Sequence, residues 1–326
     1  MQILLRSCLS LLLLLTSLSA NAASEAMTLL EQVGVAAKEL NYEGVFVYQI
    51  GNKMQSISII HRADDDGEVE RLLSLDGSAR EIIRTNDTVT CISPEKKSIN
   101  VSRRLLGDGF PSDLLSRLSS AQPYYQVKLG KAGRVAGREA QKLIIKPVDK
   151  FRYGYRLWID KETNLLLQSN LIDNKGNVLE KFSFLSINLG IDIPDEAFKP
   201  QLSGFEQQWD RRKPESTIVP SDKNIKSPWR IRWLPDGFTL VAQQNKKKAR
   251  NGAKVEQRVY SDGLSSVSIF IERIRARHSH LKGISKMGGV NAIGTIINAH
   301  FVTVVGEVPA QTVEKTGGSI RYVAPK

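Results

Sequence analysis

The residues in this 326-residue sequence that could do chemistry are a few histidines, one acidic run and a cysteine. His278 and His280 form a H-x-H pair in the arginine-rich stretch ERIRARHSH, but no set of carboxylate or thiolate ligands lies nearby to complete a zinc site. We therefore interpret both as solvated loop residues. His61 ends an expected strand and His300 precedes one, so we interpret these two as structural.

The acidic run from Asp64 to Asp66, followed by Gly67, resembles part of a calcium-binding loop. With Gly67 at the sixth loop position, Arg62 and Leu73 fall at the first and twelfth positions, where such a loop requires carboxylates. The run is better interpreted as a hairpin turn.

No familiar catalytic motif is present. The sequence contains no G-x-S-x-G, Walker or H-E-x-x-H motif, and Cys91 in TVTCIS has no flanking catalytic partners. We interpret Cys91 as a buried strand residue. The sequence therefore predicts a protein that is not an enzyme and that has no cofactor and no metal site. A cell-envelope hydrolase would need a nucleophile or metal ligands that we do not find.

The N-terminus has the pattern of a secretory signal peptide. Arg6 precedes an apolar run from Cys8 to Leu18, and Ala20 and Ala22 have the A-x-A spacing of a cleavage site. The alternative is a membrane anchor, but the run is about half of the roughly 20 residues that a span needs. We expect cleavage after residue 22 and a periplasmic mature protein. Cys91 would then be the only cysteine, which excludes an intramolecular disulfide.

The net charge of +12 is unevenly distributed. Residues 23–215 carry 27 Lys and Arg against 27 Asp and Glu, whereas residues 216–326 carry 18 against 7. A basic domain often indicates nucleic-acid binding, but a secreted protein meets little nucleic acid. The polyanions to expect are lipopolysaccharide phosphates, anionic lipid head groups or an acidic partner segment. The candidate contact residues are Arg230, Arg232, Lys246, Lys247, Lys248 and Arg258, although Lys246 to Lys248 also fit a solvated hairpin loop.

The hydrophobic pattern predicts two domains. Helical spacing of apolar residues over residues 25–40 predicts an amphipathic helix. About ten strand-like segments then follow up to residue 189, separated by turn residues, and they predict one large antiparallel sheet. We expect this large domain at residues 23–200, a proline-rich linker at 201–227, and a smaller α+β domain with an antiparallel sheet at 228–326.

Several strands of the large sheet are apolar on both faces, as in the run from Val45 to Tyr48. Few helices are available to cover them. Either the sheet curls until its interior is filled, or its concave side holds another domain or an apolar ligand in a cavity of lipid size. Strand parity does not define which face is concave, so the candidates for lining the cavity are Val45, Val47, Ile57, Ile59, Leu73 and Leu157.

Six segments, in order, resemble the MucB/RseB family of periplasmic sigma-E regulators. They are NYEGVFVY (41–48), LLSLDGSAREIIR (72–84), RYGYRLWID (152–160), WLPDGF (233–238), RVYSDGLSSVSIFIE (258–272) and HFVTVVGEVP (300–309). The sequence departs from the family pattern at Gly317 and Gly318, where relatives tend to have a better helix former.

The resemblance implies a strongly curved, LolA-like antiparallel sheet with helices in its concavity, and a smaller domain docked on it. It implies binding to the periplasmic region of a single-pass anti-sigma factor and protection of that factor from site-one proteolysis. It also implies release by lipopolysaccharide or lipoprotein acyl chains, and a homodimer. An alternative is a periplasmic lipid or lipoprotein carrier of LolA type, which would not need the basic second domain.

Overall fold

The computed structural model describes residues 25–86, 88–96, 98–103, 122–202, 210–212, 227–247, 254–274 and 283–324. The expected signal peptide, the H-x-H pair, Lys248 and most of the expected linker lie outside these ranges. None of the helices within them combines the length and apolar character that a membrane-spanning segment needs.

A helix over residues 25–39 opens the described chain, as predicted. Leu30, Val33 and Ala37 lie on one side of it and are buried, because residues three or four positions apart share a helix face. Short 3-10 helices follow later in the chain at η1 (Pro94–Lys96), η2 (Gln122–Tyr124) and η3 (Asp195–Phe198).

The large domain, by which we mean residues 25–202, is built on an antiparallel sheet, as predicted. In chain order its strands are β1 (Tyr42–Ile50), β2 (Lys53–Asp64), β3 (Gly67–Ser74), β4 (Glu81–Thr85), β5 (Thr88–Ser93), β6 (Ser98–Arg103), β7 (Tyr125–Leu129), β8 (Gly133–Val135), β9 (Arg138–Pro147), β10 (Gly154–Asp160), β11 (Leu166–Ile172) and β12 (Val178–Leu189). With β13 (Asp210–Arg212), which pairs in parallel with β6, the described residues form a 13-stranded sheet in the order β13-β6-β5-β4-β3-β2-β1-β12-β11-β10-β9-β7, and β8 pairs with β9.

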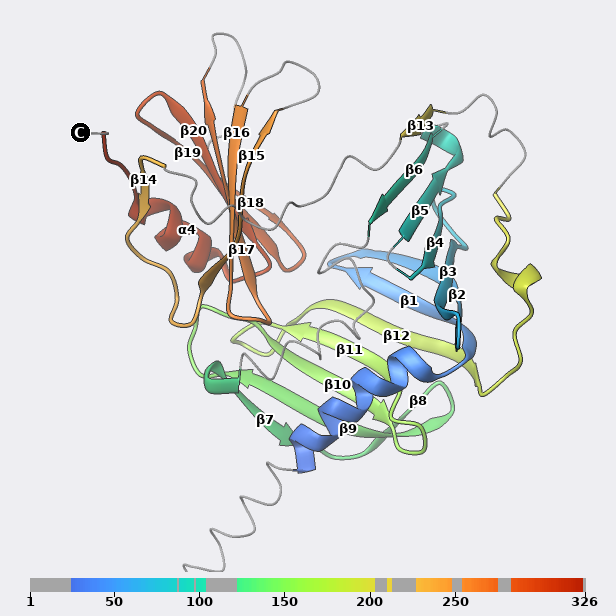
Figure 1. The fold of residues 1–326 in the computed structure, drawn as a ribbon. Coiled ribbons are helices and arrows are strands. Elements are labelled where there is room, and N and C mark those ends of the chain that lie inside the picture. The colour runs from blue at the N-terminus through green and yellow to red at the C-terminus, as the bar shows by residue number, and fades with distance from the viewer. Residues whose placement is uncertain are drawn as a thin grey trace, which may run out of the picture.

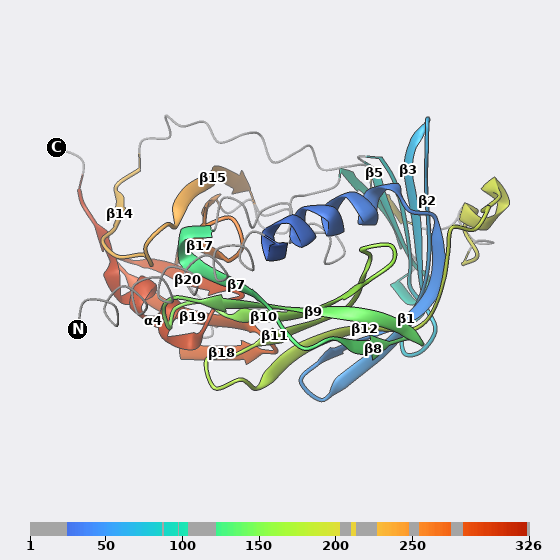
Figure 2. The same ribbon diagram turned by 90° about the horizontal axis from the view of Figure 1, so that it is seen from below.

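The sheet is strongly bent. Strands β2 to β6 stand at an angle to β7 to β12, and the N-terminal helix lies in that angle (Figures 1 and 2). Leu30 of the helix packs with Leu143 and Leu157 of the sheet, while Ala37 belongs to a cluster with Phe46. The helix therefore covers the concave face of the sheet, and its apolar side chains fill the space beneath it.

The hairpin turn predicted for the acidic run is confirmed, and a second hairpin turn joins β10 to β11. Asp160 begins the β10–β11 turn, and its Oδ1 accepts hydrogen bonds from the backbone N–H groups of Glu162 and Thr163 at 3.1 and 2.9 Å. Asp64 pairs with Gly67 across the β2–β3 turn, so the acidic run is a hairpin turn. Within the described residues, no cluster of three or more His, Cys, Asp or Glu side chains could hold a metal ion.

The chain leaves β12 across the outer strands of the large sheet. Glu81, which is fully buried, accepts hydrogen bonds from the backbone N–H groups of Gln201 and Leu202. Arg71 donates to the carbonyl of Lys199 at 3.3 Å. These contacts fix the end of the large domain on β3 and β4.

The small domain, by which we mean residues 227–324, contains an antiparallel sheet and one described helix. Its sheet has the order β15-β16-β17-β20-β19-β18, and a separate ribbon pairs β14 with β21. The bounds are β14 (Trp229–Ile231), β15 (Thr239–Lys247), β16 (Lys254–Ser261), β17 (Ser266–Arg273), β18 (Gly283–Met287), β19 (Val290–Ile297), β20 (His300–Gly306), α4 (Ala310–Ser319) and β21 (Ile320–Tyr322). The predicted fold class, mainly β with α in a large antiparallel-sheet domain and a smaller α+β domain, is confirmed.

Helix α4 includes both glycines of the departure from the family pattern. A Cβ atom at Gly317 would lie 3.1 Å from Ile293 Cγ2 and 3.6 Å from Val304 Cγ2, whereas one at Gly318 would meet nothing within 4 Å. Gly317 therefore allows α4 to pack closely on β19 and β20, which offsets its poor helix propensity.

Candidate functional site

The two domains meet at a buried ionic junction centred on Arg152. This residue lies just before β10, and its side chain is fully buried. Its Nε donates a hydrogen bond to Asp262 Oδ2 of the small domain at 2.5 Å. Its other nitrogens bind the carboxylate of Asp149 and the backbone carbonyl of Asp236. One side chain of the large domain thus binds two loops of the small domain.

Aromatic rings enclose the Arg152 guanidinium group. Its Cζ lies 4.8 Å from the ring centroid of Tyr124 and 5.1 Å from that of Phe238, within the range of cation–π attraction. Burial acts to lower the pKa of Arg152, but the hydrogen bond and charge of Asp262 outweigh it and raise the pKa above its usual range. Arg152 therefore stays charged inside the junction.

Asp262 is held in place by its own loop. Its Oδ1 accepts hydrogen bonds from the backbone N–H groups of Leu264 at 2.9 Å and Ser265 at 2.7 Å. Tyr125 of the large domain lies 3.0 Å from Ser265 Oγ through its hydroxyl, and burial together with the charge of Asp262 raises the pKa of Tyr125. Leu264 packs into the apolar cluster of the large domain that also contains residues of the N-terminal helix.

A second line of contacts runs beside α4. Asn291 Nδ2 donates to the Tyr153 hydroxyl at 2.9 Å, and Thr312 Oγ1 donates to the Phe151 carbonyl at 2.8 Å. The rings of Phe151 and Trp233 meet edge to face at 4.9 Å. Together with the Arg152 junction, these contacts dock the small domain along one end of the large sheet (Figure 2).

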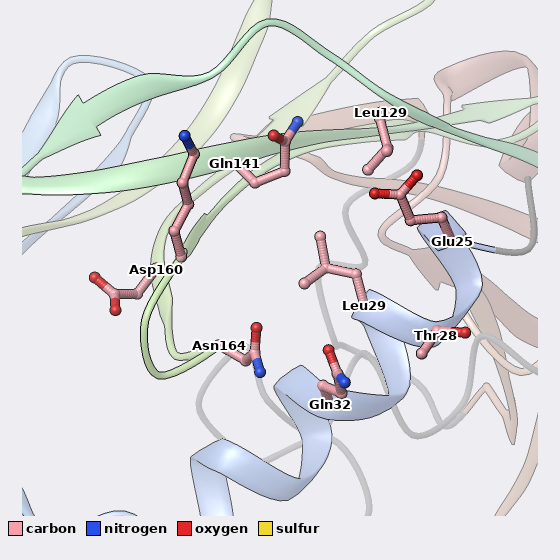
Figure 3. A pocket seen from close by; sticks show the side chains of 9 residues that line it. Glu25, Thr28, Leu29, Gln32, Leu129, Gln141, Asp160 and Asn164 are labelled. Carbon is pink, nitrogen blue, oxygen red and sulfur yellow. The ribbon is translucent and has the colours of Figure 1, made fainter. Parts of the chain in front are cut away.

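A cleft lies between the N-terminal helix and the sheet on the concave side (Figure 3). Its volume is about 610 Å³, and it is lined by Glu25, Thr28, Leu29, Gln32, Leu129, Gln141, Asp160, Lys161 and Asn164. Burial acts to raise the pKa of Asp160, but hydrogen bonds from Arg138 and Thr163 outweigh it and lower the pKa. Asp160 is therefore a fixed negative charge at this cleft.

The six candidate lining residues divide between the two faces of the sheet. Ile57 pairs with Phe46, and Leu157 pairs with Leu143, so Ile57, Ile59 and Leu157 share the face that the helix covers. Val45 and Val47 alternate with Phe46 and so point to the opposite face, as does Leu73, which pairs with Ser58. Ile59 and Leu157 are fully buried, and none of the six lines the cleft.

The basic candidates are spread over the small domain. Arg230 and Arg232 are exposed. Arg258 is only 7 % exposed and binds Glu256 and Ser227, so it lies inside the domain and not on an open surface. Lys246 and Lys247 belong to β15, where Lys247 pairs with Lys254, so the expected hairpin loop begins after them.

His61 and Cys91, which the sequence offered as possible reactive residues, are both held within strands of the large sheet. His61 is buried inside β2, with Nδ1 2.8 Å from the Leu40 carbonyl oxygen, and its ring stacks on Tyr42 at 4.9 Å. Cys91 lies in β5 as predicted. It is half-buried and not fully buried, because most side chains of β5 are only partly covered. Arg80 Nε approaches its Sγ at 3.4 Å.

Sequence reasoning missed the junction, although a signal was present. Arg152 lies in RYGYRLWID, Asp236 in WLPDGF and Asp262 in RVYSDGL. Three of the six segments that carried the resemblance therefore converge at one place in the fold. Charged and aromatic residues within such segments could have indicated a shared contact.

The architecture is that of a two-domain protein made of antiparallel sheets, with a helix in the concavity of the larger sheet. Models of two families match the chain: the MucB/RseB N-terminal domain over residues 25–202 and the MucB/RseB C-terminal domain over residues 223–321. The chain therefore belongs to the MucB/RseB family.

Two relatives illustrate the similarity in sequence. The chain is 34 % identical over 326 residues to the sigma factor AlgU regulatory protein MucB of Pseudomonas aeruginosa, covering 96 % of both chains. It is 27 % identical over 313 residues to the sigma-E factor regulatory protein RseB of Escherichia coli strain K12, covering 95 % of both. Both relatives are named as regulatory proteins.

Solved structures of MucB share the fold. A structure of MucB in complex with MucA(peri) has a TM-score of 0.69 and 30 % identity, covering 93 % of this chain and 100 % of that one. The Pseudomonas aeruginosa MucA/MucB complex has a TM-score of 0.71 and 29 % identity, covering 92 % and 100 %.

Proposed function

We propose that this protein is a periplasmic regulator that binds the periplasmic region of a membrane anti-sigma factor. By occupying that region it protects the anti-sigma factor from site-one proteolysis and so negatively regulates sigma-E. The observation that carries the proposal is the match to both MucB/RseB domains along one chain, together with a relative solved in complex with MucA(peri). The signal-peptide pattern of residues 1–22 supports the periplasmic location.

The test is protection of the partner. Purified protein is added to the periplasmic segment of the anti-sigma factor from the same organism together with the site-one protease. Cleavage should slow in proportion to the protein added and recover when the protein is heat-denatured. Unchanged cleavage at saturating protein would exclude the proposal.

For release, the cleft beside the N-terminal helix is the place where acyl chains enter. Leu29 and Leu129 supply apolar surface there, and Lys161, which now pairs with Glu139 at 3.1 Å, is a cation that a phosphate could recruit by competing with Glu139. Leu30 and Leu264 belong to the same apolar cluster, so a ligand that displaces the helix also repacks the contact with the small domain. A lipid shifts binding only if it favours the free form, and about 1.4 kcal/mol of difference gives a tenfold shift.

Lipid uptake is measured with a fluorescent lipid A analogue on the full chain. Leu29→Glu should weaken uptake, because it places a charge against the apolar wall of the cleft. The exposed residue Val178 provides the matched control, and Val178→Asn should leave uptake unchanged. Equal uptake by all three proteins would place the lipid elsewhere.

A lipid or lipoprotein carrier is the second candidate, and the cleft is the observation that favours it. A carrier must deliver cargo to an acceptor, whereas a regulator needs only to bind its partner. Transfer of labelled lipoprotein between donor and acceptor vesicles, with no effect on proteolysis of the anti-sigma factor, would favour the carrier.

A homodimer also remains a proposal, and sedimentation of the purified protein over a range of concentrations tests it.

A further inference from the structure

Two carboxylates from different domains approach each other beside the junction. Glu180 belongs to β12 and is 8 % exposed, whereas Glu307 follows β20 and is half-buried. Gly289 lies between them: a Cβ atom there would be 3.2 Å from Glu180 Oε1 and 3.3 Å from Glu307 Cγ. Within the described part of the chain, neither carboxylate forms an ion pair with Lys, Arg or His.

The two carboxylates are unequally hydrogen-bonded. Glu180 accepts from the Tyr48 hydroxyl at 2.5 Å and from the Gly289 N–H at 2.9 Å. Among the described residues, the only hydrogen bond to Glu307 is a long one from the Tyr155 hydroxyl at 3.4 Å. Hydrogen bonds to the ionised form favour ionisation, so the weakly hydrogen-bonded Glu307 is the carboxylate that retains a proton. Burial and the charge of Glu180 raise the pKa of Glu307 to about 7.

Among the residues that the structure describes, the titratable groups that act on this pair are neutral or acidic. Tyr48 from β1, Tyr153 just before β10 and Tyr155 within β10 have pKa values raised by burial and also by the nearby carboxylates. Asp173, after β11, adds a further negative charge near Tyr153. The local field therefore opposes a second charge on the pair.

We propose that Glu180 and Glu307 form a proton-dependent latch between the two domains. The docked form holds one proton on Glu307, and undocking lets that carboxylate ionise in water and release the proton. Acidification then favours docking, and alkalinisation weakens it. This inference goes beyond the proposed function, because it concerns the free chain and requires neither an anti-sigma factor nor a lipid.

The direction of the pH dependence of docking follows from the raised pKa of Glu307. Undocked Glu307 titrates near its ordinary value of 4.5, and docked Glu307 near 7. The stabilisation of docking is fully present below the lower value and is lost as the pH rises through the higher one. With these two values, the docking equilibrium constant should fall roughly 50- to 100-fold between pH 5 and pH 8.

Amide hydrogen exchange on the full chain tests the latch. The Gly289 N–H is protected by Glu180, and the Leu264 N–H by Asp262 at the Arg152 junction. With correction for the intrinsic pH dependence of exchange, the protection factors of both amides should fall roughly 50- to 100-fold from pH 5 to pH 8. Glu307→Gln cannot ionise, so it should abolish this fall. Glu314→Gln, which changes an exposed carboxylate on α4, should retain it.

Two results would overturn the proposal: protection in the wild type that is independent of pH, or a fall that persists in Glu307→Gln. If only Gly289 responds, the pair controls its own turn and not the docking of the domains, which also refutes the latch. If Glu307→Gln does not fold, Glu180→Gln provides a second test. It removes the charge that raises the pKa of Glu307, so the fall should move to lower pH, and an unmoved midpoint would contradict the latch.

Discussion

Arg152 of the large domain and Asp262 of the small domain form an ion pair in which both side chains are fully buried, with 2.5 Å between Nε and Oδ2. The two residues are far apart in the sequence, and they lie in loops at the ends of different sheets. Buried ion pairs are costly to desolvate and costly to break. Separating the domains would break this pair, so the pair favours the docked arrangement.

Removing the guanidinium group should destabilise the docked protein. Arg152→Met leaves Asp262 buried without its cation, and we expect a loss of about 3–5 kcal/mol in the free energy of unfolding, measured by urea titration at neutral pH. Arg156→Met, in the adjacent strand β10 and partly exposed, is the control and should cost less than about 1 kcal/mol. The double variant Arg152→Met/Asp262→Leu should recover part of the loss. Equal effects of the two single variants would contradict the role of the ion pair.

The strands could be predicted because alternation and turn residues are local signals. Strands β6, β8 and β13 were missed: SINVSR in β6 contains only two apolar residues, and the other two strands are very short. The concave face could not be predicted, because Val45 and Phe46 are equally apolar and only the helix in the fold distinguishes them. The Arg152–Asp262 pair could not be predicted from local pattern, since it depends on how two separate sheets dock.

Gly237 gives a second prediction at the junction. Its φ of +84° is in the left-handed region, and an added Cβ atom would overlap the ring of Tyr124. Gly77 has a similar φ of +67° but open space around it, so Gly77→Ala measures the backbone strain alone. We expect Gly237→Ala to destabilise the protein by about 1–3 kcal/mol more than Gly77→Ala in thermal or urea unfolding. In a Tyr124→Ala background, much of the difference in destabilisation between the two glycine variants should disappear. Equal destabilisation by the two glycine variants in the wild-type background would exclude the overlap.

Asp160 should make stability depend on acid. Its pKa is lowered below the ordinary value of 3.8 because Arg138 and Thr163 donate hydrogen bonds to the carboxylate, which outweighs the opposing effect of burial. The stabilisation is present above that ordinary value and is lost as the pH falls through the lowered one. Asp160→Asn should therefore lower the free energy of unfolding by about 1–3 kcal/mol at pH 7, measured by urea titration.

When Asp160→Asn and the wild type are compared again at pH 4 and pH 3, the difference between their free energies of unfolding should become progressively smaller. Asp173→Asn serves as a related case, since Asp173 also has a lowered pKa but its partners are exposed turn atoms, so its cost should be smaller. A difference for Asp160→Asn that is constant between pH 7 and pH 3 would show that charge is not the cause.

The basic end of the β15–β16 hairpin should act mainly on the rate of association. Lys246 and Lys247 end β15, and Lys248 follows them in the sequence. Reversing all three charges should lower the association rate constant with the anti-sigma segment by about tenfold at low salt, because long-range attraction steers encounter. The dissociation rate constant should change much less, and the loss should shrink at high salt.

The control reverses three exposed lysines of the large domain, Lys38, Lys131 and Lys175, which gives the same change in net charge. Because residues 23–215 are neutral overall, that variant should slow association less than the hairpin variant does. Both rates are measured by stopped-flow fluorescence over a range of salt concentrations. A faster dissociation with unchanged association would instead place the lysines in the docked interface, and equal slowing by both variants would reduce the effect to net charge alone.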